Sequence, residues 1–259
     1  MVVPEAFATR LRTAATLVVL PPVVVLIGVA VIALALAGVS NARIHRLYVL
    51  YARVCVRVGG TRLFVRGAER IGARQAYVVV PNHESNWDSP CVVAALPRLV
   101  VRFVAKQEIM RIPIFGHALR ATGNIRVVRK QTRGDVARIQ AVMGQRDPDV
   151  SILFFAEGTR SSDGAFHGFK MGAFATALGH HLPVLPVGIA GTRPIWPKGI
   201  LRVRRGSVAI EVGDPIAVDG LGHDDRAALR DRTHAAVAEL RARARARLRE
   251  LGADPEGID

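Results

Sequence analysis

The feature that most constrains this chain is an uncharged apolar run close to its start. Residues 14–38 contain no charged side chain, although charged residues make up 22% of the 259 residues. About 20 consecutive apolar residues are enough for a helix to cross the hydrocarbon core of a bilayer. We therefore expect residues 1–58 to form a helical segment that associates with a membrane, separate from the globular remainder of the chain.

Two adjacent prolines, Pro21 and Pro22, interrupt the run. Proline disrupts helices, so we expect two shorter apolar helices that meet at a bend. Arg10 and Arg12 precede the run, and four arginines follow it within residues 43–57. Because basic flanks favour the cytoplasmic side, we expect a re-entrant or in-plane anchor at the cytoplasmic face rather than a single span. A cleaved signal peptide is the alternative, but its apolar region is usually only about 7–15 residues long.

Beyond residue 58, short apolar runs alternate with helical patterns. The expected strands cover residues 62–65, 76–80, 100–105, 125–128, 151–155, 184–189 and 208–212. The expected helices between them cover residues 89–96, 112–121, 135–145 and 168–179. Strands that alternate with helices predict an α/β domain, here residues 59–220, with a mostly parallel central sheet flanked by helices.

The end of the chain predicts one long helix over residues 224–251. Apolar side chains recur there every three or four residues, from Leu229 to Leu251, and arginines occupy the other positions. This pattern is typical of an amphipathic helix that packs by one stripe. We expect the C-terminal segment, residues 221–259, to pack on the domain in this way. The sequence leaves open whether its arginines face solvent or touch anionic lipid.

The formal net charge of +15 indicates an anionic partner. Nucleic acid, lipid headgroups and phosphorylated substrates all have the required charge. An aromatic content of 5% and the lack of a nucleic-acid-binding motif argue against nucleic acid. Cys55 and Cys91 are the only cysteines, and they form no C-x-x-C pair. They support neither a disulfide framework nor a zinc site, so we expect no metal.

A histidine and an aspartate follow one of the predicted strands. His83 lies just beyond the strand at 76–80, and Asp88 lies five residues later, near the start of a helix. Ligands of open α/β sheets bind at the carboxyl ends of strands. A carboxylate beside an imidazole fixes its tautomer and stabilises its protonated form. The chain has no G-x-S-x-G motif to supply an enzyme serine, so we expect His83 to act on a hydroxyl of the substrate.

The alternative is structural, with Asp88 as a helix cap and His83 as an ordinary turn residue.

A second polar stretch follows the predicted strand at 151–155. It contains Glu157, Gly158, Thr159 and Arg160, and Lys170 comes later, near a predicted helix start. An arginine offers several donors to phosphate oxygens, and a glycine lets the backbone approach a ligand. Helix starts also favour anions. We expect a phosphate-binding loop here, and the alternative is a glycine turn with a surface ion pair.

Together these stretches resemble the glycerolipid acyltransferase family, which includes the 1-acylglycerol-3-phosphate acyltransferases. The resemblance runs from about residue 63 to residue 215, with four blocks in the family's order. Asn82-His83 with Asp88 resembles the N-H-x-x-x-x-D block, which supplies the family's catalytic base and orienting acid. Residues 157–161 resemble the block that binds the phosphate of the acyl acceptor.

The other two blocks are weaker signals on their own. The stretch from Gly123 to Arg129 resembles the block associated with the acceptor. Pro186 belongs to a stretch that resembles the fourth block, which is linked to the acyl chain and the fold. Lys106 lies in a segment that resembles the one between the first two blocks.

The resemblance implies transfer of a fatty acyl group from acyl-CoA or acyl carrier protein to the free hydroxyl of a lysophospholipid. The acceptor it favours is 1-acylglycerol-3-phosphate, which would give phosphatidate. His83 would be the general base, without a covalent intermediate or a cofactor, and Arg160, Arg129 and Lys106 would hold the acceptor phosphate. Ala156 stands where the family usually has proline, which bears on the acceptor more than on the chemistry.

Three alternatives stay open at this point. The acceptor is another lyso-lipid, the protein is a hydrolase with its own serine nucleophile, or it is a non-catalytic module that binds anionic lipid. The sequence does not determine the acyl donor, the acyl chain length or the oligomeric state.

Overall fold

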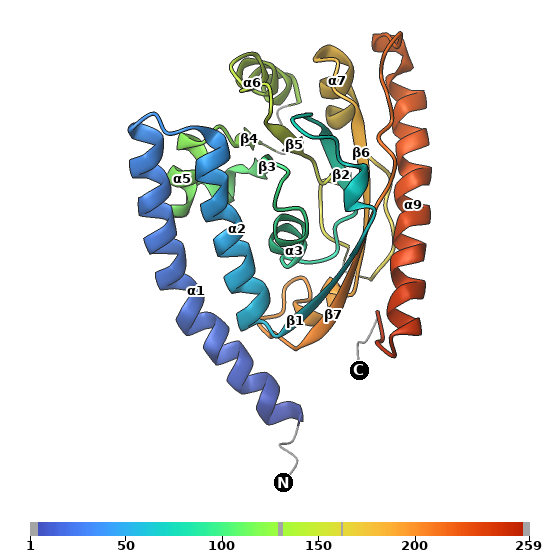
Figure 1. The fold of residues 1–259 in the computed structure, drawn as a ribbon. Helices are drawn as coiled ribbons and strands as arrows, with labels where there is room; N and C mark the ends of the chain where they lie inside the picture. Colours follow the sequence, from blue (N-terminus) through green and yellow to red (C-terminus); the bar gives the residue numbers. More distant parts are fainter. Residues whose placement is uncertain (1–4, 129–131, 162, 256–259) are drawn as a thin grey trace.

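A seven-stranded sheet forms the centre of the computed structural model (Figure 1), which describes residues 5–128, 132–161 and 163–255, with the backbone alone at 132, 133, 136 and 137. The strands are β1 (Thr61–Arg66), β2 (Val78–Pro81), β3 (Val101–Lys106), β4 (Ile125–Val127), β5 (Ser151–Leu153), β6 (Val184–Ala190) and β7 (Gly206–Val212). Each overlaps one of the seven predicted strands.

The strand order in the sheet is β1-β7-β6-β2-β5-β3-β4. Neighbouring strands are parallel except for β6 and β7, which are antiparallel. The prediction of a mostly parallel sheet is therefore confirmed. Because β2 lies between β5 and β6, the loops that leave the carboxyl ends of these three strands emerge side by side. This arrangement brings together the first, third and fourth of the sequence blocks.

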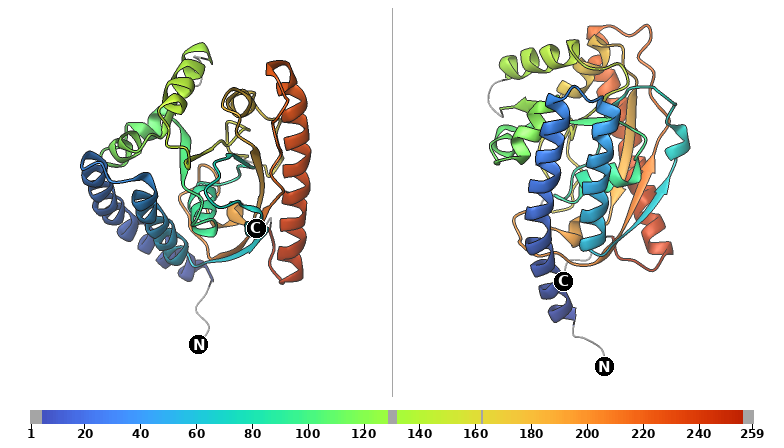
Figure 2. Two further views of the ribbon diagram at one scale, coloured as in Figure 1. Left: turned by 45° about the horizontal axis from the view of Figure 1, so that its top comes forward. Right: turned by 60° about the vertical axis from the view of Figure 1, so that its left-hand side comes forward.

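Helices cover both faces of the sheet. They are α1 (Glu5–Leu36), α2 (Asn41–Val58), α3 (Asp88–Ala95), α4 (Gln107–Met110), α5 (Phe115–Ala121), α6 (Thr132–Gly144), α7 (Gly172–Gly179), α8 (Thr192–Ile195) and α9 (Arg226–Glu250), with short 3₁₀ turns at Ala68–Arg70 and His223–Asp225. Figure 2 shows α1 and α2 antiparallel on one side of the molecule and α9 on the opposite side.

The β2 strand shows how the two faces divide, because side chains alternate along a strand. Val79 belongs to a core that it shares with α2 and α3. Val78 and Val80 belong to a second core, which they share with α6, α7 and α9. All three valines are fully buried, so the strand that leads to His83 is held firmly from both sides.

The expected break at Pro21-Pro22 is wrong, because α1 continues through both prolines. Each proline removes only the hydrogen bond to the carbonyl four residues earlier, and the apolar sequence on both sides continues the helix. The chain turns later, at Gly38, whose φ of 70° is a left-handed conformation that ends helices. The amide of Val39 there donates to the carbonyl of Leu34 at 2.9 Å.

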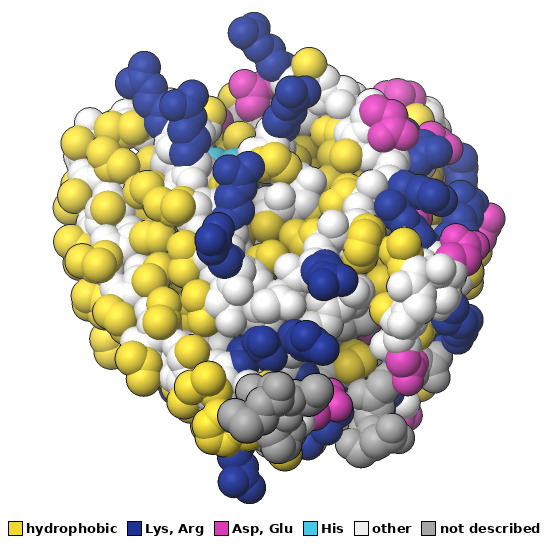
Figure 3. Space-filling view, turned by 60° about the horizontal axis from the view of Figure 1, so that its bottom comes forward, with side chains coloured by type: hydrophobic (Ala, Val, Ile, Leu, Met, Phe, Trp, Pro, Cys, Tyr) yellow, Lys and Arg dark blue, Asp and Glu magenta, His cyan; other side chains and the backbone are white. Residues whose placement is uncertain are grey.

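The α1 helix leaves much of its apolar surface uncovered. At 32 residues it is about 48 Å long, and within the described chain it is the one helix long and apolar enough to cross a membrane. Figure 3 shows hydrophobic side chains spread over the side of the molecule where α1 lies, with lysines and arginines beside them. The most exposed apolar side chains on this helix are Phe7, Leu11, Val18, Leu26 and Leu36. These features suggest a membrane anchor.

Candidate active site

The predicted pair of His83 and Asp88 meets at the carboxyl end of β2. His83 follows Pro81, the last residue of the strand, by two positions, and Asp88 is the first residue of α3. The Nδ1 atom of His83 lies 2.7 Å from Oδ2 of Asp88. The histidine side chain is 17% exposed, whereas the aspartate side chain is fully buried. The imidazole therefore reaches the surface while its partner stays out of water.

Asp88 is surrounded by hydrogen-bond donors. Its Oδ2 atom also accepts the backbone N–H groups of Glu84 and Ser85, at 2.7 and 2.8 Å. Its Oδ1 atom accepts the Thr192 hydroxyl at 2.5 Å. Because the carboxylate serves as an acceptor for these three donors, Nδ1 of His83 is the donor in the remaining contact. This tautomer leaves Nε2 with a free lone pair, which is what a general base needs.

Asp88 makes no side-chain cap on its own helix. Its carboxylate oxygens do not bind the N–H groups of α3. They accept instead the N–H groups of the preceding loop and the Thr192 hydroxyl. The structural alternative for Asp88 is therefore wrong.

The side chain of Asn82, the residue directly after β2, fixes the backbone around His83. Asn82, which is 1% exposed, donates to the carbonyl of Ile189 at 3.0 Å and accepts its N–H at 2.7 Å. This pair of bonds continues the pairing of β2 with β6 after β2 has ended. Asn82 thus sets where the loop leaves the sheet.

Glu157, the acid of the third block, points at the backbone of the first block. Its Oε1 atom accepts the N–H of His83 at 2.7 Å, and its Oε2 atom accepts the N–H of His167 at 3.1 Å. In return, Ser161 N–H donates to the His83 carbonyl at 2.9 Å. Burial raises the pKa of Glu157 to about 7, against the lowering effect of the two N–H donors. The Glu157 carboxylate therefore links the loop of His83 to the loop that follows β5.

Phe155 supports the imidazole from one side. The two rings stack with centroids 3.7 Å apart and planes 17° apart. A stacked ring fixes the orientation of the imidazole and keeps water from one face. Phe155 lies two residues after β5, so the adjacency of β2 and β5 produces this contact.

Cationic side chains gather around Gly158, where φ is +72°. This left-handed conformation favours glycine, and a Cβ atom there would lie 2.7 Å from Cε and Nζ of Lys170, so the lysine lies directly over the turn. Lys198 donates to the carbonyl of Arg160 at 2.9 Å, and its ammonium lies 3.4 Å from the Thr159 hydroxyl. Lys170 and Lys198 are exposed, and Arg160 is half-buried. The loop thus presents three cations next to the histidine loop.

Other predicted site residues lie elsewhere. Lys106 ends β3, which β5 separates from β2. Gly123 precedes β4, the edge strand, which β5 and β3 separate from the strand of His83. Pro186 is a buried residue within β6 and pairs with Val80, so its position is structural. Arg129 lies outside the described residues.

Two residues near the site were missed by sequence reasoning. Thr192 follows the carboxyl end of β6, so a hydroxyl directly after a buried central strand was the available signal. Lys198 had no such signal, because it lies in an irregular segment and its contact with Arg160 depends on the path of that segment.

Comparisons with known proteins agree with this geometry. A family model described as Acyltransferase matches residues 62–190. The chain is 32% identical over 222 residues to 1-acyl-sn-glycerol-3-phosphate acyltransferase alpha of Homo sapiens, which covers 85% of this chain and 74% of the relative. It is also 32% identical over 161 residues to 1-acyl-sn-glycerol-3-phosphate acyltransferase of Limnanthes alba, covering 62% of this chain and 56% of that relative.

A solved structure shares the fold. The crystal structure of the 1-acyl-sn-glycerophosphate (LPA) acyltransferase PlsC from Thermotoga maritima matches with a TM-score of 0.76 and 23% identity, over 92% of this chain and 98% of that one. The solved structure shows the same fold, and the sequence relatives show the family. Because the human relative matches over most of both chains, this chain belongs to the 1-acylglycerol-3-phosphate acyltransferase family and is an O-acyltransferase.

Proposed function

We propose that the protein transfers a fatty acyl group from an acyl thioester to the free hydroxyl of 1-acylglycerol-3-phosphate and so makes phosphatidate. The hydroxyl oxygen attacks the thioester carbonyl, an ester bond forms, and the thiolate leaves. His83 takes the hydroxyl proton through Nε2 and returns it to the departing sulfur. The donor is acyl-CoA or acyl carrier protein, and no acyl group is carried by the enzyme.

The observation that carries this proposal is the contact between His83 Nδ1 and Asp88 at 2.7 Å. It fixes the imidazole in the tautomer whose other nitrogen is basic, and a neighbouring carboxylate stabilises the imidazolium that forms during transfer. General base catalysis of this kind contributes about 10²–10⁴-fold to a rate.

The acceptor phosphate would bind at the cations around Gly158. Arg160 and Lys170 come from the loop after β5 and Lys198 from the segment after α8, and Lys170 and Lys198 are already held against Gly158 and Arg160. Charge-assisted bonds to phosphate are about twice as strong as neutral ones, and a fixed headgroup converts a random encounter into an aligned attack. Lys106, at the end of β3, and Arg129, outside the described residues, remain part of this proposal through the sequence resemblance.

The decisive experiment is an incubation of the purified protein with a labelled acyl thioester and a panel of lyso-lipids, with products identified by mass spectrometry. The panel should pair each acceptor with acyl-CoA and with acyl carrier protein. Labelled phosphatidate as the main product supports the proposal. Equal transfer to uncharged acceptors would contradict the phosphate site, and a trapped acyl-enzyme in intact-mass measurement would contradict direct transfer.

We also propose that the protein lies on the cytoplasmic face of a membrane, with α1 inserted in-plane or re-entrantly. The arginines of α2 support this placement. They are Arg43, Arg46, Arg53 and Arg57, all exposed on a helix that runs antiparallel beside α1. A spanning α1 would carry this charged helix to hydrocarbon depth, where each arginine costs several kcal/mol.

This placement can be tested with single cysteines at Phe7 and at Gly38, at the two ends of α1, labelled by a membrane-impermeant maleimide. The native cysteines, Cys55 and Cys91, are buried. We expect both new cysteines to react from the same side of sealed vesicles. Labelling from opposite sides would show that α1 spans the membrane.

A further inference from the structure

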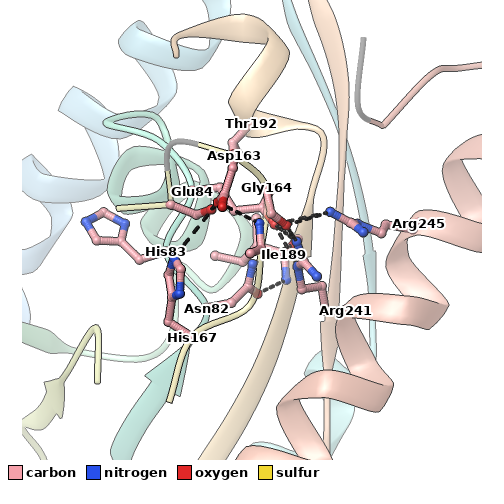
Figure 4. A network of polar contacts seen from close by, with 12 residues as sticks. Asn82, His83, Glu84, Asp163, Gly164, His167, Ile189, Thr192, Arg241 and Arg245 are labelled. Carbon is pink, nitrogen blue, oxygen red and sulfur yellow. Dashed lines mark hydrogen bonds and ion pairs between the residues drawn. The ribbon is translucent and has the colours of Figure 1, made fainter. Parts of the chain in front are cut away.

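The side chain of Glu84 lies inside the protein although it belongs to the loop that carries His83. It is 4% exposed, and its Oε1 atom lies 2.6 Å from both Nε and Nη2 of Arg241. Arg241 comes from the middle of α9, and its side chain is 10% exposed. Arg245, one turn further along, reaches the same carboxylate at 3.7 Å. Figure 4 shows both arginines approaching the loop from the helix.

Arg241 also holds a second loop. Its Nη2 atom donates to the carbonyl of Gly164 at 2.5 Å, and its guanidinium lies 5.8 Å from the centre of the Phe166 ring. Gly164 follows the loop of Glu157 and Arg160 in sequence. A single side chain therefore joins the loop of the base to the loop that we assign to the acceptor phosphate, from the side opposite to His83.

The contact is linked to the reacting groups through the backbone. The N–H of Glu84 donates to Asp88, and the carbonyl of His83 accepts the N–H of Ser161. A movement of Glu84 would therefore change both the shell of donors around Asp88 and the spacing between the two loops. A buried ion pair is strongly destabilised when one partner is removed, so the remaining carboxylate would have to move or take up a proton.

We propose that Arg241 and Glu84 are positioning residues for acyl transfer, and that α9 thereby helps to align the base with the bound acceptor. The inference rests on the proposed function, because it assigns the two loops to proton transfer and phosphate binding. Neither side chain touches the substrate. The pair holds the two loops in the register in which an acceptor bound at Arg160 presents its hydroxyl to His83.

The chain contains a matched control on the same helix. Arg247 lies 3.5 Å from Glu211 of β7, with side-chain exposures of 17% and 9%. Its guanidinium also lies over a ring, 5.7 Å from the centre of Phe64. Arg247 thus joins α9 to the sheet by the same kinds of contact, but far along the helix from the two site loops. Its loss reports what an arginine of α9 contributes to packing alone.

The test compares Arg241→Ala with Arg247→Ala in the full-length protein, by steady-state kinetics with acyl-CoA and 1-acylglycerol-3-phosphate. A misalignment of about 1 Å in an active site costs on the order of 10²-fold in rate, so we expect kcat to fall by that order in Arg241→Ala. Arg247→Ala should change kcat by no more than about twofold, as for an isolated partly exposed pair. Free guanidinium should restore part of the kcat of Arg241→Ala and leave that of Arg247→Ala unchanged. Equal losses in the two variants, or no rescue of the first, would overturn the inference.

If Arg241→Ala does not fold, Glu84→Gln tests the same inference. This substitution keeps the shape of the side chain and removes its charge. We expect a lowered kcat in the folded protein, and the double variant Glu84→Gln with Arg241→Lys should be no slower than the slower single variant. Independent, multiplying losses would show that the two residues do not act as a pair. A wild-type protein without phosphatidate synthesis would refute the proposed function, whereas an active wild type with an equally active Glu84→Gln would refute this inference alone.

Discussion

The two loops that meet at His83 are built in different ways. In the first loop, buried polar side chains have partners inside the protein: Asn82 binds β6, Ser85 binds the Trp196 carbonyl at 2.7 Å, and Asp88 has four donors. At the loop after β5, the cations are Lys170, from that loop, and Lys198, from the segment after α8, and both are exposed to solvent. Under the proposed function, the loop assigned to proton transfer is complete without substrate, whereas the loop assigned to phosphate binding is completed by the acceptor.

The largest loss of turnover should come from a substitution in the first loop. His83→Ala removes the base, and we expect the turnover number to fall by about 10²–10⁴-fold, since nothing else in the loop offers a lone pair to the hydroxyl. Turnover is measured with 1-acylglycerol-3-phosphate and acyl-CoA. His167→Ala is a suitable control, because its backbone binds Glu157 while its imidazole is 44% exposed. If His83→Ala folds and keeps wild-type turnover, His83 is not the base, and the first loop is not the proton-transfer loop.

A smaller loss of kcat is expected when Asp88 loses one of its hydrogen-bond donors. Thr192→Val keeps the shape of the side chain but removes the hydroxyl that donates to Oδ1 at 2.5 Å. A hydrogen bond to a charged group contributes about 1.5–3 kcal/mol. Part of this energy holds the carboxylate in place, so we expect kcat to fall about tenfold while the acceptor KM stays constant. Thr192→Ser retains the hydroxyl and should restore kcat. A changed KM with a constant kcat would place Thr192 with the second loop instead.

The second loop should show the opposite kinetic pattern. Arg160→Ala is expected to raise the KM for 1-acylglycerol-3-phosphate about fivefold and to leave kcat nearly unchanged, because a half-buried guanidinium is partly screened by water. A monoacylglycerol without phosphate serves as the control acceptor, and its KM should be the same for wild type and variant. Equal increases for both acceptors would mean that Arg160 does not read the phosphate.

The fold and the contact between His83 and Asp88 could be predicted from sequence because both depend on local patterns. Each strand is a short apolar run, and His83 and Asp88 lie on one loop, so their meeting needs only the turn between β2 and α3. The partners that the sequence did not reveal come from distant segments. Thr192 and Arg241 are 104 and 157 residues away from Asp88 and Glu84, and no spacing rule connects them.

The two long helices show the limit of composition as a guide. The C-terminal helix was predicted from periodicity and the N-terminal one from an uncharged apolar run, yet α1 leaves apolar side chains such as Val18 outside, while α9 places Arg241 inside. A helix with many arginines is normally expected to solvate them. Whether a given arginine faces water depends on which carboxylate the fold brings opposite to it, and in α9 that carboxylate is Glu84.

The smallest predicted effect concerns Glu157, which joins the two loops. Burial raises its pKa to about 7, above the value of an unfolded chain, so its contribution to stability is fully present at low pH and is lost as pH rises through 7. One pKa unit corresponds to about 1.4 kcal/mol, or about 3–6 °C in Tm for a protein of this size. We expect wild type to lose at least this much Tm between pH 5 and pH 8.5, relative to Glu157→Gln, which cannot ionise. Parallel Tm profiles for the two proteins would show that Glu157 ionises normally, and that the two loops are joined by an ordinary carboxylate at every pH tested.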